Sequence, residues 1–159
     1  MKTLLLCLTL ALTVTPGANP QASKAAEATQ HATGSFDVKI APQPADATAG
    51  SPSIARMLID KHFHGDLEAT SKGTMLAVGS GAKGSSGGYV ALEIVTGTLK
   101  GHTGTFFLQH TGTMMRGTPT LSVTVVPDSG TGQLIGLAGA MSINIVDGKH
   151  SYDFEYTLP

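Results

Sequence analysis

Glu93 and His110 are the residues of this chain whose chemistry and spacing suggest a site, because each interrupts an apolar segment. If residues 100–101 form a two-residue hairpin turn, positions whose numbers add to 201 face each other. Glu93 then lies diagonal to His110 on one face, which also carries Tyr89. A carboxylate beside an imidazole in a low-dielectric cavity can transfer protons. The same pattern also fits a hydrogen-bonded pair that fixes the strand register, or two exposed side chains, so we assign no catalytic residue.

Gln109 and Glu68 complete the candidate pocket residues, with Gln109 on the opposite face of the hairpin from Glu93. Both faces carry apolar side chains, so the pattern leaves open which one is interior. His62 and His64 share a strand face near several carboxylates, a ligand set that suits zinc or iron. We expect them at a wet hairpin end, and we therefore predict no metal site and no cofactor.

Short segments rich in β-branched and aromatic residues must position these side chains, because no window after residue 30 has a helical period. Without helical crossovers, consecutive strands pair antiparallel. An eight-stranded antiparallel β-barrel is the favoured all-β fold, since closure removes exposed edges, and a sandwich is the alternative. The predicted strands are residues 34–40, 54–62, 67–78, 89–98, 103–113, 118–126, 139–146 and 151–158.

Glycine and proline mark the connections between these strands. We expect loops at 41–53 and 79–88, a turn at Asp147-Gly148, and a bulge or bend at Gly73. A weak repeat begins at residues 65, 97 and 132, with the sequences GDLEATSKGTM, GTLKGHTGTFF and GQLIGLAGAMS. Each copy places a leucine two residues after a glycine, which indicates a recurring hairpin geometry.

The N-terminus has the pattern of an export signal. Residues 1–18 combine Lys2 with an apolar run over 3–14, which is too short to span a bilayer. We expect cleavage after a residue between 17 and 25, a flexible leader over 19–31 and a single barrel domain over 32–159. The prediction is a periplasmic or extracellular protein with no stable membrane span once the signal is removed.

Composition excludes several classes of function. The 159 residues include 10 Lys+Arg and 11 Asp+Glu, giving a net charge of -1, so we expect no nucleic-acid binding. The single cysteine, Cys7, lies in the predicted signal, which excludes a disulfide framework and thiol catalysis in the mature chain.

Three stretches, residues 63–70, 92–113 and 126–139, carry a family resemblance. The most specific parts are LQHTGT and VVPDSGTGQLIGLAG, and together the stretches resemble the bacterial family called domain of unknown function 3224. The resemblance extends from Ala32 to the C-terminus. It implies a barrel similar to that of allene oxide cyclase, which is lipocalin-like, and it implies no established activity. The chain departs from the commoner pattern in its signal peptide and in a turn at Met114-Met115.

These observations leave three hypotheses for function. The first is a module that binds a small apolar or amphipathic ligand, because eight strands enclose room for one. The second is an isomerase or cyclase acting on a lipid-like substrate, by analogy of fold. The third is a ligand-free structural barrel that acts through contacts in a homo-oligomer. The sequence leaves open whether the protein is an enzyme.

Overall fold

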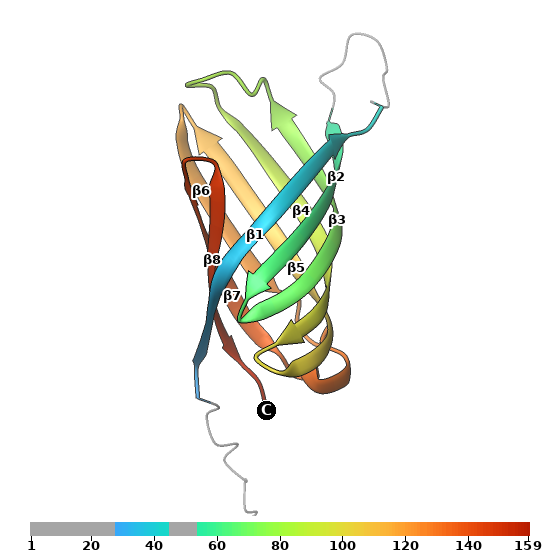
Figure 1. The fold of residues 1–159 in the computed structure, drawn as a ribbon. Helices are drawn as coiled ribbons and strands as arrows, with labels where there is room; N and C mark the ends of the chain where they lie inside the picture. Colours follow the sequence, from blue (N-terminus) through green and yellow to red (C-terminus); the bar gives the residue numbers. More distant parts are fainter. Residues whose placement is uncertain (1–27, 45–53) are drawn as a thin grey trace, which may run out of the picture.

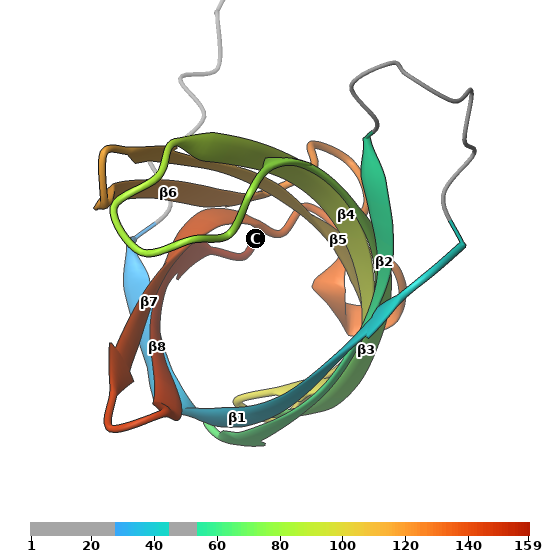
Figure 2. The same ribbon diagram turned by 90° about the horizontal axis from the view of Figure 1, so that it is seen from above.

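The computed structural model describes residues 28–44 and 54–159, whose strands form one closed antiparallel barrel (Figures 1 and 2). Each strand is hydrogen bonded to the next, and β8 returns to β1. A short 3-10 helix, η1 (Gly132–Leu134), precedes β7, and the described residues include no helix able to cross a bilayer. The strands are β1 (Gln30–Pro42), β2 (Ala55–Gly65), β3 (Leu67–Gly79), β4 (Gly87–Leu99), β5 (His102–Met115), β6 (Thr118–Val125), β7 (Ala138–Val146) and β8 (Lys149–Thr157).

The predicted eight-stranded all-β barrel is confirmed, and the differences are local. β1 begins at Gln30, so the last two residues of the expected leader pair with β8 and help to close the barrel. β5 continues through Met115, and the turn expected at Met114-Met115 is formed by Arg116 and Gly117 instead. The predicted signal peptide lies outside the described residues, as does most of the loop predicted at 41–53.

Two-residue turns set the register of the hairpins. Lys100 and Gly101 have φ values of 44° and 90°, and Asp147 and Gly148 have 50° and 76°. Two consecutive residues of positive φ match the right-handed twist of the strands that they connect. The predicted pairing of positions that add to 201 is confirmed along the whole β4–β5 hairpin.

A bulge or a bend was expected at Gly73, and the structure shows no bulge there. The register of β3 with both neighbours runs through Gly73 without interruption. A Cβ at this position would lie 2.6 Å from the carbonyl oxygen of Leu92 and 3.0 Å from the Cα of Glu93. Glycine is therefore needed here for the close approach of β4, which carries Glu93 into the barrel.

The two ends of the barrel differ. The lower end in Figure 1 holds the turns at 65–66 and 100–101 together with η1. Its interior is filled by apolar side chains, including the leucines of the three repeats, Leu67, Leu99 and Leu134, each with no exposed surface. Phe106 and Phe154 stack in the same core, with ring centroids 6.0 Å apart. The leucine of each repeat therefore contributes to the apolar packing that closes this end of the barrel.

Candidate functional site

A cluster of four buried polar side chains lies inside the barrel. We call Lys61, Ser71, Glu93 and His110 the buried polar cluster; their exposed fractions are 5, 2, 0 and 3%. The Lys61 Nζ donates a hydrogen bond of 2.8 Å to the Glu93 Oε2. The His110 Nε2 lies 3.4 Å from the same oxygen. The β4–β5 register places His110 diagonal to Glu93, and β2, two strands from β4 along the barrel wall, supplies Lys61.

Aromatic rings complete the surroundings of Lys61. Its Nζ lies 5.0 Å from the ring centroid of Phe36 and 5.6 Å from that of Phe63, distances at which a cation is attracted to an aromatic face. Sequence reasoning missed Lys61. The signal was the alternation along β2, where Ile59, Lys61 and Phe63 share the inward face.

The charge of Glu93 is stabilised by its neighbours. Burial on its own raises the pKa of this carboxyl, but His110 at 3.4 Å and the Lys61 ammonium lower it. The lowering prevails, so the pKa of Glu93 lies below its ordinary value of 4.5 and the group is ionised at neutral pH. The cluster therefore contains a true buried ion pair.

Hydrogen bonding in the cluster is incomplete. Among the described residues, three buried atoms have no hydrogen-bond partner: Ser71 Oγ, Glu93 Oε1 and His110 Nε2. Buried polar atoms are nearly always paired with protein or water, so the cluster has capacity for a further donor and acceptor.

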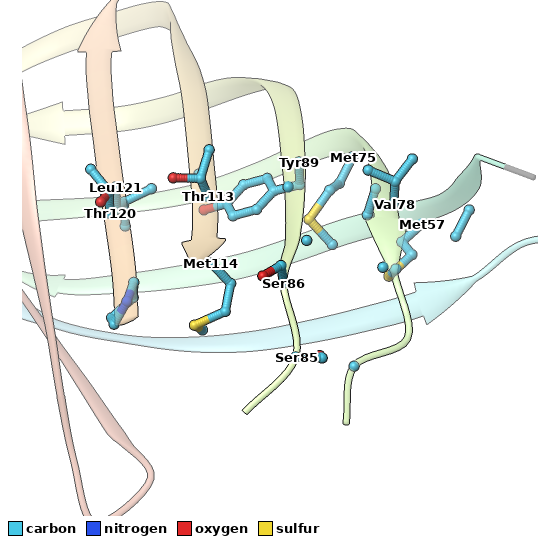
Figure 3. Close-up of a pocket in the computed structure, with 18 of the residues that line it drawn as sticks. Met57, Met75, Val78, Ser85, Ser86, Tyr89, Thr113, Met114, Thr120 and Leu121 are labelled. Atoms are coloured by element: carbon cyan, nitrogen blue, oxygen red, sulfur yellow. The ribbon is translucent and has the colours of Figure 1, made fainter. Parts of the chain in front are cut away.

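Beside this cluster, the upper end of the barrel contains an apolar cavity of about 420 Å³ (Figure 3). Its wall consists mainly of glycine, alanine and methionine, with Ser85 and Ser86 in the loop between β3 and β4. The residues that surround it in Figure 3 include Met57, Met75, Val78, Ser85, Ser86, Tyr89, Thr113, Met114, Thr120 and Leu121.

Of the candidate pocket residues, the structure places one in the cavity wall, two in the buried polar cluster and two outside the barrel. Tyr89 lines the cavity, with its ring against Gly112, where a Cβ would collide with it. Glu93 and His110 point to the same interior, one or two inward positions deeper along β4 and β5, and do not line the cavity. Gln109 is exposed on the outer wall. Glu68 is exposed at the β2–β3 hairpin, where it accepts a hydrogen bond from the Gly65 amide.

Tyr89 lines the cavity, and its phenol is affected by the charge of Glu93 in the buried polar cluster. Burial and the charge of Glu93 both raise the pKa of its phenol, so Tyr89 is neutral at physiological pH and can donate or accept a hydrogen bond in the cavity wall.

His62 and His64 are exposed, and the described part of the chain contains no group of three or more side chains that could hold a metal ion.

Comparisons with known proteins agree with the fold. Residues 32–156 match the family described as "Protein of unknown function (DUF3224)". A similar solved structure is that of a protein with unknown function from the DUF3224 family of Shewanella oneidensis MR-1, with 46% sequence identity and a TM-score of 0.76. The match covers 83% of this chain and 98% of the other. No curated protein matches. The resemblance seen in the sequence motifs is thus confirmed, and the chain belongs to the DUF3224 family of β-barrel proteins.

Proposed function

We propose that this protein binds a small apolar or amphipathic molecule in the cavity at the upper end of the barrel. The observation that carries the proposal is the contrast between the two ends, one filled by leucine and phenylalanine and the other hollow and lined by apolar atoms. A volume of about 420 Å³ lies in the range of small-molecule sites. Ser85 and Ser86 lie in the lining and suit a ligand with one polar end.

The enzyme alternative has less support. An isomerase or cyclase needs a group that moves protons in contact with its substrate. Glu93 and His110 are almost fully buried and do not line the cavity, and among the described residues the neutral phenol of Tyr89 is the titratable group that does. Binding without turnover is therefore the function we propose.

A substitution that fills the cavity tests the proposal. Ala77→Phe places a ring in the cavity wall, whereas Ser122→Phe adds the same ring to the exposed outer wall of β6. The probe is anilinonaphthalene sulfonate, an apolar dye whose fluorescence increases on binding. We expect its affinity to fall at least tenfold for Ala77→Phe and to be unchanged for Ser122→Phe. Circular dichroism and thermal unfolding verify that both variants fold.

The ligand itself is best identified by mass spectrometry of molecules that co-purify with the protein from its native host. Equal probe binding by the wild type and both variants, with no co-purified molecule, would support the ligand-free structural barrel instead. Release of a chemically altered molecule would support the enzyme.

The proposed location is outside the cytoplasm. The support is the apolar run of residues 3–14 behind Lys2, which has the length of a signal-peptide core.

A further inference from the structure

The outer wall of the barrel carries a contiguous apolar patch. We call these six residues of β2 to β5 the outer patch, and their side chains are between 38 and 55% exposed. The strand register makes them neighbours: Leu76 faces Val90, and Ile94 faces Phe107. The outer patch consists of Leu58, Leu76, Val90, Leu92, Ile94 and Phe107.

The rest of the outer wall is different. On β6 the outward positions are threonine and serine, among them Ser122 and Thr124. On β1 and β8 they include Asp37, Lys39 and Asp153. An apolar environment on all sides of the barrel would favour apolar residues on the outer face of every strand. An apolar face on one side alone indicates a partner that covers that side.

We propose that the outer patch is the interface between two copies of this chain. At their exposed fractions the six side chains present on the order of 500 Å² of apolar surface, at the upper end of what a typical monomer exposes. With a polar rim, this approaches the roughly 800 Å² that each partner contributes to a standard interface. The apolar area therefore supplies most of a standard interface, and the polar rim has to supply the remaining area of roughly 300 Å².

The charges around the outer patch also fit a second copy. A two-fold interface brings the same surface together twice, so a patch with strong net charge would repel itself. The border of the outer patch carries Asp60 and Lys72, joined by an ion pair of 2.6 Å, with Arg56 as a further charge on β2. These three residues leave a net charge of +1 on each copy, which is too small for strong self-repulsion, and a two-fold partner can present Lys72 to Asp60 and Asp60 to Lys72.

Two matched valines provide the test. Val90 lies in the outer patch and is 53% exposed, and Val146 lies at the β7–β8 hairpin and is 58% exposed. We compare Val90→Glu with Val146→Glu by analytical ultracentrifugation of the purified chain at micromolar concentration. Because the N-terminal segment is common to both variants, any association that it causes cancels in the comparison.

The expected result is a mass of at least two chains for the wild type and for Val146→Glu, and the mass of one chain for Val90→Glu. Far-ultraviolet circular dichroism should show the same fold for all three proteins. A wild type that sediments as a monomer would overturn the proposal. A Val90→Glu variant that assembles as the wild type does would overturn it equally. Probe binding in the cavity is a separate measurement, so failure here leaves the proposed function standing.

Discussion

Replacing Glu93 by glutamine tests whether the ion pair inside the barrel is real and closed to water. Glu93→Gln keeps the shape of the side chain and leaves the Lys61 ammonium, which is 5% exposed, without its carboxylate. Removal of one partner from a buried pair costs about 3–5 kcal/mol because the other charge stays desolvated. With a urea slope of about 2 kcal/mol/M, the unfolding midpoint should fall by about 1.5–2.5 M.

The pH dependence supplies a second readout. The pKa of Glu93 is lower in the folded state than its ordinary value of 4.5, so its stabilising effect is fully present above that pH. It is lost as the pH falls through the folded pKa, because protonation then removes the charge. The difference in stability between wild type and Glu93→Gln should therefore be largest near neutral pH and should shrink in acid.

A double variant separates loss of the pair from loss of packing. Lys61→Met combined with Glu93→Gln removes both charges and keeps an unbranched side chain between Phe36 and Phe63. We expect it to recover at least half of the stability lost in Glu93→Gln, since neither charge is then left unpaired. The reasoning is refuted if Glu93→Gln costs less than about 1 kcal/mol, or if the double variant is no more stable than the single one.

Three further predictions concern the barrel and its N-terminus. Gly73→Ala should cost about 1–3 kcal/mol in urea unfolding because its Cβ meets strand backbone, whereas Gly88→Ala should be nearly neutral. Tyr152→Phe should cost about 1–3 kcal/mol, because its hydroxyl accepts a hydrogen bond from a buried backbone amide. Tyr156→Phe should cost less, since its partner is an exposed amide side chain. Mass spectrometry of protein recovered outside the cytoplasm of the native host should find a chain that begins after a residue between 17 and 25.

Each of these has a clear opposing result. Equal stabilities of Gly73→Ala and Gly88→Ala would mean that β3 and β4 do not approach as closely as described. Equal losses for the two tyrosine variants would show that burial of the amide partner is not what decides the cost. An intact N-terminus on protein recovered outside the cytoplasm would refute the cleavable signal.

Local rules were sufficient to predict that Glu93 and His110 lie diagonal to each other on one face of the β4–β5 hairpin. The turn at 100–101 fixes the register of two adjacent strands, and alternation then places both side chains on one face. The sequence did not show which face is interior, because Val90, Leu92 and Phe107 make the outer face apolar as well. Gln109 became a candidate for that reason, and the closed barrel places it outside.

Lys61 illustrates what local rules miss. It lies 32 residues before Glu93, on a strand separated from β4 by β3. The register of a single hairpin relates only adjacent strands, so it does not show that these two side chains meet above β3. A lysine among apolar residues looks like a solvated charge until its neighbours are known. The cavity has the same origin, since its walls come from β2 to β6 and the connecting loop.

The class and order of the strands, the register of the β4–β5 hairpin and the family could all be predicted from the amino-acid sequence, because turns, alternation and motifs are local properties of the chain. Three features emerge only in the folded barrel: which face is interior, the contact of Lys61 with Glu93, and the contrast between a filled end and a hollow one. The interior face and the contrast between the two ends depend on closure of β8 onto β1, which excludes water from the enclosed space. Lys61 meets Glu93 because the β2–β3 and β3–β4 registers combine along the barrel wall.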